Sequence, residues 1–466
     1  MRLKILLVAL LLGGCAIPAS KPALAPTPAT ALGLVGAAAP AIDAQWWRVY
    51  DDPQLDRVVD DALAGNPTLA TALARVRQAS ATLASRRSDN GPNATFDASQ
   101  QYARLSGKYE IPPPFAGTTR FISQDQFNLD WTLDLFGRQR DAIEAARDST
   151  RAAVLDVTAA RLALAGSVVQ AYVELARAER QAAIAQATIG ARANSLRLVD
   201  VRVRNRLASG LETEAARTLL AQARLALVQA QASQALAKNA LAALAGRGAD
   251  YPATIAATRM RLDAPMALPA TLPADLLARR ADIAAALARI DAAAKGREVA
   301  RKAFYPNVNL MALAGLQAIG IGNVLTGDAV TAGGGAAVHL PIFDNGRLKA
   351  QLAGATALVD LAIADYNERV VRAVREAADA SARIGALDAE RQRSREVVRG
   401  FSATGRLNAI RVSSGLDSKL DLVDNDVRTL AAQQDDADLA ADAADARVAL
   451  VMALGGGYDN RQETPR

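Results

Sequence analysis

The sequence is internally duplicated, with a period of about 210 residues. Matched segments occur in the same order in both halves, at residues 72 and 286, 91 and 305, 137 and 346, 210 and 415, and 243 and 453. Because the order is preserved, every element predicted in one half needs a counterpart in the other. We therefore expect repeat 1 over residues 41–248, a linker over 249–272, repeat 2 over 273–457 and a C-terminal tail over 458–466.

Each repeat is predicted to begin with a helix and to continue with a pair of strands. The two helices are expected over residues 53–88 and 273–304. The strand pairs are expected to begin just after Pro92 and just after Pro306. Glycine- and proline-rich segments then link the two strands of each pair.

The clearest strand signal is a period-two alternation from Phe121 onward. One parity carries large apolar residues and the other carries polar ones: Phe121, Phe127, Leu129 and Trp131 against Gln124, Gln126, Asn128 and Asp130. Such alternation indicates a strand with one apolar and one polar face. A weaker alternation over 308–316 predicts the third strand. The fourth is expected to end at Ile342, with His339 on its polar side.

A pair of long antiparallel helices is predicted after each strand pair. Residues 138–208 contain no proline, and a continuous helix of that length would extend about 100 Å. A returning helix is expected over 212–244, and repeat 2 predicts the same pair over 347–412 and 418–454. Helices this long need lateral partners, because they cannot fold back into a small globule.

Four strands of about ten residues are long enough to cross a bilayer but too few to close a barrel. Open sheet edges are excluded from lipid because their backbone groups would stay unpaired. Two copies would supply eight strands around a filled interior, whereas three would supply twelve and leave room for a pore. The predicted fold class is an internally duplicated α+β membrane protein, in which four transmembrane β-strands contribute to an oligomeric barrel and long antiparallel α-helices form a tunnel.

The composition argues against an enzyme. A single histidine and a single cysteine exclude His/Cys metal clusters and a disulfide within the chain. Aromatic residues make up only 4% of the chain, too few for several thick cores. The net charge of +6 comes from basic residues interspersed with acidic ones, so we expect no nucleic-acid partner. We also expect no metal and no cofactor other than a covalent lipid.

The N-terminus predicts export and lipid attachment. Basic residues precede an apolar run over 3–12 that is too short to span a bilayer, which is typical of a secretory signal peptide over residues 1–14. The motif Leu-Gly-Gly-Cys ending at Cys15 resembles a lipobox, whose cysteine takes lipid as the signal peptide is cleaved. Ala16 favours sorting to the outer membrane, by resemblance to Gram-negative lipoproteins. Residues 15–40, rich in Ala and Pro, are expected to form a lipidated tether.

Ordered stretches along the mature chain carry a family resemblance: Trp46-Trp47, Asp52-Pro53-Gln54-Leu55, residues 62–67, residues 131–138, residues 279–283 and residues 340–347. Together they resemble the TolC-like outer-membrane efflux proteins, in particular the lipoprotein branch with OprM- and NodT-type members. The resemblance implies a homotrimer with a twelve-stranded barrel and a twelve-helix periplasmic tunnel. It also implies a periplasmic adaptor, an inner-membrane pump, most often of the RND type, and a passive exit duct for small molecules such as drugs.

The same resemblance assigns a periplasmic gate. Residues 415–424 are similar to the family segment that narrows the tunnel entrance, with Leu420 as an apolar ring and Asp421 and Asp424 as acidic rings. Three copies would place six carboxylates near one axis, where they would attract cations and resist anions.

Tip turns and adaptor contacts are expected at two positions in each repeat: Gly210, Leu211, Gly415 and Leu416. Strand-to-helix junctions are expected at Gly137 and Gly346. Ala216 and Asp417 depart from the family pattern of residues that latch the closed state. The latch bonds are therefore not carried over, and Lys419 and Glu214 are candidate replacements.

Three alternatives stay open at this point. A channel for protein or peptide secretion would use a similar tube. A periplasmic adaptor would carry one helical hairpin and many short β segments, and a structural envelope lipoprotein would not explain the alternating strands. The exported substrate and the particular pump and adaptor do not follow from the sequence.

Overall fold

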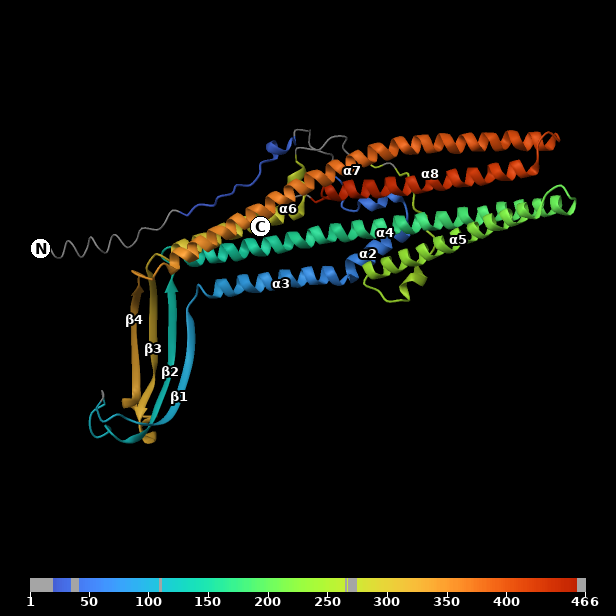
Figure 1. Cartoon of the computed structure of the whole chain (residues 1–466). Helices are drawn as coiled ribbons and strands as arrows, with labels where there is room; N and C mark the ends of the chain where they lie inside the picture. Colours follow the sequence, from blue (N-terminus) through green and yellow to red (C-terminus); the bar gives the residue numbers. More distant parts are fainter. Residues whose placement is uncertain (1–19, 35–41, 109–110, 265, 267–274, 459–466) are drawn as a thin grey trace. The chain divides into compact units, whose positions relative to one another are not determined.

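Long helices and one antiparallel sheet make up most of the chain (Figure 1). The structure is a computed structural model that describes residues 20–34, 42–108, 111–264, 266 and 275–458. The longer elements are α2 (Pro53–Gly65), α3 (Pro67–Ser88), β1 (Asn93–Arg104), β2 (Thr119–Leu133), α4 (Arg138–Arg204), α5 (Gly210–Leu244), α6 (Ala281–Lys302), β3 (Asn307–Ile319), β4 (Val330–His339), α7 (Arg347–Ser413) and α8 (Lys419–Ala453). α4 and α7 each have 67 residues, and α5 and α8 each have 35, so the duplication extends to element lengths. The predicted α+β content is confirmed.

The prediction of one continuous helix over residues 53–88 is wrong, because the helix breaks into α2 and α3 at Asn66. Asn66 has an extended ψ of 123°, as expected before a proline. Its Oδ1 accepts hydrogen bonds from the backbone N–H groups of Thr68 (2.8 Å) and Leu69 (3.2 Å), while its Nδ2 donates to the carbonyl of Leu244 (2.8 Å). Asn66 therefore caps α3 and ties its start to the end of α5.

Two other predicted bounds also differ from the structure. α6 begins at Ala281 instead of near residue 273, because a 3-10 turn at Leu276–Arg279 and the extended Arg280 precede it. β4 ends at His339 instead of Ile342. Pro341, two residues further on, has no N–H to donate to a ladder, which explains the early end.

The four strands form one antiparallel meander in the order β1-β2-β3-β4 (Figure 1). The register places Phe96 opposite Phe127, Phe127 opposite Ala314, and Ala314 opposite Ala332. Because side chains alternate between the faces of a strand, this row lies on one face of the sheet. Among the described residues, β1 and β4 each have a strand partner on one side only.

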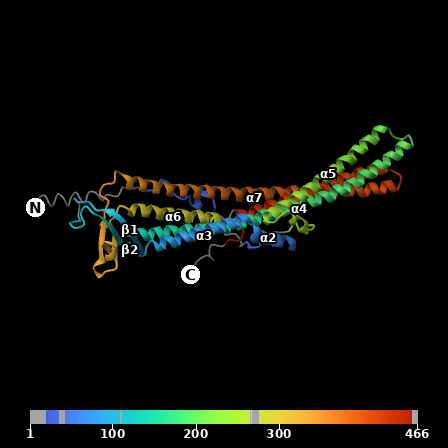
Figure 2. The ribbon, with the colours of Figure 1, turned by 90° about the horizontal axis from the view of Figure 1, so that it is seen from below.

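The chain divides into two compact units that do not follow the two repeats. One comprises the described residues of Met1–Pro26, Arg75–Ala153 and Ala285–Tyr366, and the other those of Thr27–Ala74, Val154–Ala284 and Asn367–Arg466. The sheet belongs to the first unit. The hairpins α4–α5 and α7–α8 turn within the second, and both helix pairs can be followed in Figure 2. Each unit therefore combines segments from both halves of the duplication.

In the first unit, α4 and α7 begin shortly after β2 and β4 and are capped alike. Asp134 accepts hydrogen bonds from two backbone N–H groups in the first turn of α4, at 2.9 and 3.0 Å. Asp344 accepts one from the Gly346 N–H just before α7 (3.1 Å) and one from the Leu348 N–H in its first turn (2.8 Å). Gly137 and Gly346 have left-handed φ angles of +74° and +84°, which residues with a Cβ rarely adopt. The chain turns from strand to helix at these two glycines.

The two junctions differ in one buried carboxylate. Asp141, in the first turn of α4, is 6% exposed. Its Oδ2 lies 2.6 Å from Lys302 Nζ and its Oδ1 lies 3.5 Å from Lys295 Nζ, both on α6. The corresponding residue of α7 is Ala350, so repeat 2 has no such pair.

In the second unit, the core gathers around the aromatic residues of η2 (Trp46–Tyr50) and the middle of α4. Asp52, 4% exposed, caps α2 by accepting a hydrogen bond from the Gln54 N–H (2.9 Å). Its Oδ2 also accepts from the Tyr172 hydroxyl and the Arg259 N–H, both at 2.8 Å. The Asp-Pro-Gln-Leu stretch thus joins α2, α4 and the segment before α6.

Residues 20–34 run beside α7, in contrast to a free tether. In the first unit, Asp360 accepts hydrogen bonds from the N–H groups of Ala23 (2.8 Å) and Leu24 (2.9 Å). In the second unit, Asn367 accepts one from the Thr27 N–H (2.7 Å), and Leu34 is buried. The signal peptide over 1–14 and the lipidation site at Cys15 lie outside the described residues.

Candidate functional site

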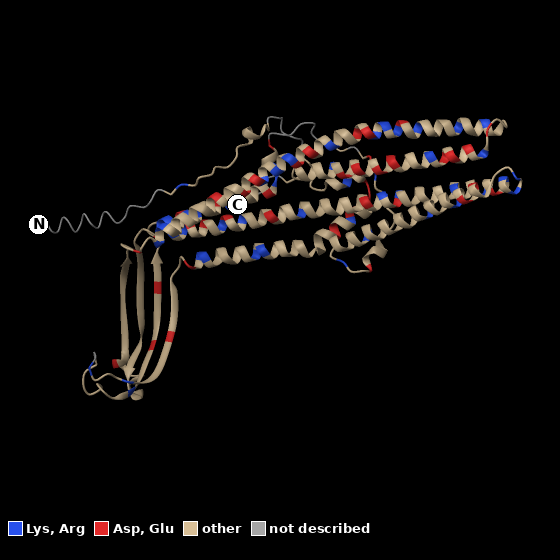
Figure 3. Ribbon diagram, viewed as in Figure 1, with Lys and Arg blue, Asp and Glu red and all other residues tan. Residues whose placement is uncertain are grey.

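One face of the sheet is largely apolar although its side chains are exposed. Phe96, Tyr102 and Phe127 are 56%, 73% and 63% exposed, and each takes part in an aromatic pair across β1 and β2. The β3 and β4 residues on this face are small or aliphatic: Val308, Leu310, Ala312, Ala314, Leu316, Ala318, Val330, Ala332, Gly334, Ala336 and Val338. Charged residues are few on the strands and frequent on the helices (Figure 3). The chain by itself therefore leaves an apolar sheet surface uncovered.

The predicted alternation missed a polar cluster on this apolar face. Ser123 and Asp125 share the parity of Phe127, and Gln100 lies opposite Ser123. Gln100 Nε2 donates to Ser123 Oγ (2.9 Å) and to both Asp125 oxygens (2.8 Å), and Ser123 Oγ donates to Asp125 Oδ2 (2.6 Å). These bonds satisfy one another locally, which reduces the cost of placing polar groups on an apolar face.

The opposite face of the sheet is polar on β1 and β2, and on β3 it also carries the apolar Met311 and Leu313. A chain of side-chain hydrogen bonds crosses it from Gln124 to Gln126, Asn128 and Asp97, with distances of 2.8 to 3.0 Å. His339 pairs with Asn307 and lies on this polar side, as its parity predicts. A polar lining of this kind suits a wall that faces water.

The hairpin turns at the ends of α4 and α7 are closed by the same cap. In repeat 2, Gly415 has a φ of +72°, its N–H bonds the Val412 carbonyl (3.1 Å), and the Leu416 N–H bonds the Arg411 carbonyl (2.8 Å). This is a Schellman cap, in which the left-handed position favours glycine. The left-handed φ at this cap therefore explains why glycine occupies position 415.

The residue of repeat 1 equivalent to Gly415 is Arg206, not Gly210. Arg206 has a φ of +58°, and the N–H groups of Arg206 and Leu207 make the same pair of bonds to the end of α4. Gly210 is the first residue of α5, so the expectation that it makes the turn is wrong. Gly137 and Gly346 are 209 residues apart, and the same spacing counted back from Gly415 gives Arg206. This spacing was the sequence signal that could have identified the turn residue of repeat 1.

Leucines are exposed at both turns. Leu207, Leu211 and Leu416 are 69%, 79% and 67% exposed. Leu211 and Leu416 were expected at the hairpin turns. Leu207 was not expected there, because its equivalence to Leu416 becomes apparent only from the Schellman cap that Arg206 and Leu207 form. Exposed apolar side chains at a hairpin end are suited to contact with another protein.

Leu420, Asp421 and Asp424 all lie in the first two turns of α8. Ser418 caps this helix, and its Oγ accepts hydrogen bonds from the N–H groups of Leu420 (3.0 Å) and Asp421 (3.4 Å). Leu420 is half-buried, while both aspartates are exposed. The cap orients this segment, and the positive helix end favours the acidic residues there.

Sequence reasoning missed the basic partner of Asp424. Arg192 of α4 places Nη1 at 3.5 Å from Asp424 Oδ1, and its side chain is only 18% exposed. This ion pair joins the first hairpin to the second. Of the replacements considered, Glu214 instead pairs with Arg217 (2.6 Å) within α5. The sequence does not indicate which face of α4 contacts α8.

A close approach of α7 and α8 holds the start of α8 in place. Asn425, 6% exposed, donates its Nδ2 to the Phe401 carbonyl (3.1 Å). A Cβ at Gly405 would lie only 2.7 Å from the same Nδ2, so glycine permits this contact. The polar Asn425 is thus buried with a partner immediately after Asp424.

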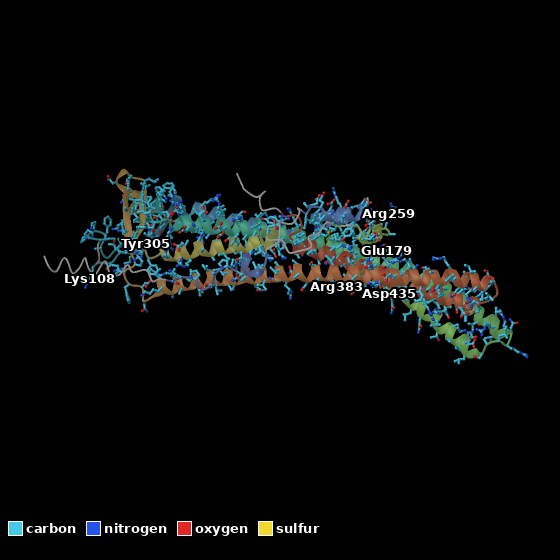
Figure 4. The ribbon with its side chains drawn as sticks, turned by 90° about the horizontal axis from the view of Figure 1, so that it is seen from above. Lys108, Glu179, Arg259, Tyr305, Arg383 and Asp435 are labelled. Carbon is cyan, nitrogen blue, oxygen red and sulfur yellow. The ribbon has the colours of Figure 1, made fainter. Side chains whose placement is uncertain are left out.

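Further along, α4 and α8 are joined by a second ionic group. Arg177 Nη2 lies 2.7 Å from Asp442 Oδ1 and 3.5 Å from Asp445 Oδ2. Burial raises the pKa of Asp445 to about 6, against the opposing effect of Arg177. Glu179, labelled in Figure 4, accepts two hydrogen bonds from Thr258, at 2.9 and 2.7 Å. The middle of α4 is therefore fixed both to α8 and to the segment before α6.

The family described as Outer membrane efflux protein matches residues 58–247 and 272–456. The fusaric acid resistance protein FusA of Burkholderia cepacia is 36% identical, over 76% of this chain and 69% of FusA. The toluene efflux pump outer membrane protein TtgF of Pseudomonas putida is 30% identical, over 90% of this chain and 87% of TtgF. The outer membrane protein VceC of Vibrio cholerae matches with a TM-score of 0.82 and 31% identity, over 90% of this chain and 100% of VceC.

Proposed function

The chain belongs to the outer membrane efflux protein family and is an outer-membrane channel component of an efflux system, and we propose that three copies of it form one channel. The observation that carries this proposal is the sheet with one apolar face, one polar face and two edges. Among the described residues neither edge has a partner, and a sheet in lipid must close. Three copies would supply twelve strands, enough for an aqueous lumen. The apolar face would meet lipid and the polar face would line the lumen.

We further propose that Leu420, Asp421 and Asp424 form the periplasmic gate. Their support is their common position at the capped start of α8. In a trimer, six carboxylates would converge on a narrow passage, favour cations and hinder anions. The channel would work by moving helices and not by chemistry, in keeping with a family of transport channels.

The Arg192–Asp424 pair is proposed as a latch between the two hairpins. Its support is that it connects α4 to α8 near the tips, so that spreading the hairpins would break it. Asp424 would then have two roles, as a pore charge and as a latch partner. The two roles are separable, because Asp421 has only the first and Arg192 only the second.

We propose that the cargo consists of small molecules, with apolar or aromatic compounds foremost. The support is that FusA is named for fusaric acid resistance and TtgF for toluene efflux. The exposed Leu207, Leu211 and Leu416 would contact a periplasmic adaptor, which links the channel to an inner-membrane pump. Lipid on Cys15 would hold the N-terminus at the outer membrane.

Three experiments test this function. Native mass spectrometry of the detergent-extracted chain should give three copies, and a stable two- or four-copy assembly would contradict the trimer. Deleting the gene should increase sensitivity to aromatic acids, solvents or drugs, and restoring the intact chain should reverse this. If Cys15→Ser leaves lipid attachment unchanged by mass, the proposed lipidation site is wrong.

A further inference from the structure

The second unit contains a pocket that none of the functions above uses. It has a volume of about 480 Å³. Its lining comes from one face of α7 and from α8: Asp388, Arg391, Gln392, Arg395, Val398, Arg399 and Asp436. Arg383 and Asp435, labelled in Figure 4, lie on α7 and α8 just before these residues in sequence. The pocket is about 20 Å from the end of α7, at 1.5 Å per residue from Arg399.

Arg391 is buried without a partner. The residue is 8% exposed, and its Nε is closed off from solvent and makes no hydrogen bond. Among the described residues, Arg391 forms no hydrogen bond or ion pair through its terminal nitrogens either. The terminal nitrogens of Arg391 keep some solvent-accessible surface, and Arg391 lines the pocket, so these nitrogens reach the pocket. A buried guanidinium with no partner is unfavourable, which points to a missing anion.

The surrounding charges do not supply that anion. Asp388 already forms an ion pair with Arg447, whose Nη2 lies 3.2 Å from Asp388 Oδ1. Asp436 also lines the pocket, and its Oδ1 is buried without a hydrogen-bond partner, but no ion pair joins Asp436 to Arg391. Burial lowers the pKa of Arg391, and Arg395 acts in the same direction while Asp436 opposes it. The lining thus has three arginines against two aspartates, one of which is already paired.

We propose that this pocket binds an anionic oxygen group, a carboxylate or a phosphate, with Arg391 and Arg395 as its ligands. A guanidinium presents forked N–H donors that match both groups, and its hydrogen bonds to them are charge-assisted. A volume of this size admits a small anion with its waters. The group is carried either by a small free anion or by a carboxylate side chain of a neighbouring copy of this chain.

The test uses the full-length oligomer in detergent, dialysed into chloride and titrated with inorganic phosphate at constant ionic strength. Phosphate should raise the thermal unfolding midpoint of the wild type, with a shift that grows with the logarithm of the phosphate concentration above the dissociation constant. Arg391→Met should weaken the apparent phosphate affinity at least tenfold. The matched control is Arg393→Met on the same helix, whose side chain is 75% exposed and pairs with Glu396 (3.0 Å); it should respond like the wild type.

The outcomes separate the two sources of the anion. If a neighbouring copy supplies a carboxylate, the wild type will not respond to phosphate, but Arg391→Met will lower the temperature at which the oligomer dissociates, and Arg393→Met will not. Arg395→Gln, on the exposed rim, gives a second readout with little risk to folding and should weaken the same response. The proposal is overturned if phosphate has no effect on any variant and Arg391→Met dissociates like the wild type.

Discussion

Breaking the ion pair between Arg192 and Asp424 should shift the channel toward its open state. The pair spans 3.5 Å and joins the α4–α5 hairpin to the α7–α8 hairpin. We expect Arg192→Gln to remove it while leaving Asp421 and Asp424, the proposed gate aspartates, in place. Movement of the hairpins away from each other would then meet less resistance.

The size of the effect follows from the exposure of the two partners. Asp424 is 53% exposed, so solvent screens the pair even though Arg192 is largely covered. A pair of this kind contributes about 0.5–1 kcal/mol. If three copies open together, three broken pairs amount to about 1.5–3 kcal/mol, or a rise of about 10- to 150-fold in the ratio of open to closed channels.

Single-channel recording in planar bilayers measures this ratio directly. The matched control is Arg217→Gln, which removes the same charge but breaks only the Glu214–Arg217 pair within α5. The double exchange Arg192→Asp with Asp424→Arg should restore closure, and the difference should shrink at high salt. The reasoning is refuted if Arg192→Gln and Arg217→Gln channels open equally often.

Four further predictions follow from the same structure. Asp421→Ala, which leaves the latch intact, should weaken block by multivalent cations without raising the open probability; unchanged block in bilayer recordings would remove Asp421 from the pore. Gly415→Ala should lower stability by about 1 kcal/mol because of its left-handed φ, whereas Gly210→Ala, at the start of α5, should be neutral; thermal unfolding compares the two. Asp445→Asn should raise stability at pH 7.5 by about 1–2 kcal/mol, allowing for partial exposure. The pKa of Asp445 is raised to about 6, so the folded chain binds a proton at this carboxyl group more readily than the unfolded chain does. The stability of the wild type should therefore fall as the pH rises from about 4 to 6. Denaturation measured as a function of pH should show that Asp445→Asn lacks this dependence. Asp52→Ala should lower stability by about 2–4 kcal/mol because it leaves the buried Tyr172 hydroxyl and the partly buried N–H groups of Gln54 and Arg259 unpaired, while Asp60→Ala on the exposed side of α2 should change little; equal unfolding midpoints would contradict the assignment.

The order and type of the elements could be predicted because their causes are local. The alternation around Phe127 predicts β2, and the proline-free stretches predict α4 and α7. The errors occurred where one side chain decided the backbone. Asn66 breaks the first helix by capping α3, and Arg206 takes a left-handed φ at a turn where a glycine four residues away was expected.

The candidate gate was only partly predictable. The sequence placed Leu420, Asp421 and Asp424 together because they lie within two turns of one helix. It did not indicate Arg192, which is 232 residues away from Asp424 along the chain. Each residue of an α-helix points about 100° from the last, so a charged residue on a 67-residue helix gives no local sign of which neighbour it faces.

The sequence by itself therefore determined the duplication, the strand faces, the long helices and the family resemblance. These depend on periodicity, on proline and glycine, and on residue types a few positions apart. Only the tertiary structure decided that the compact units combine both repeats, that Arg192 meets Asp424, and that Arg391 is buried without a partner. These features depend on which faces of distant helices pack together, because burial and pairing are properties of that packing and not of local sequence.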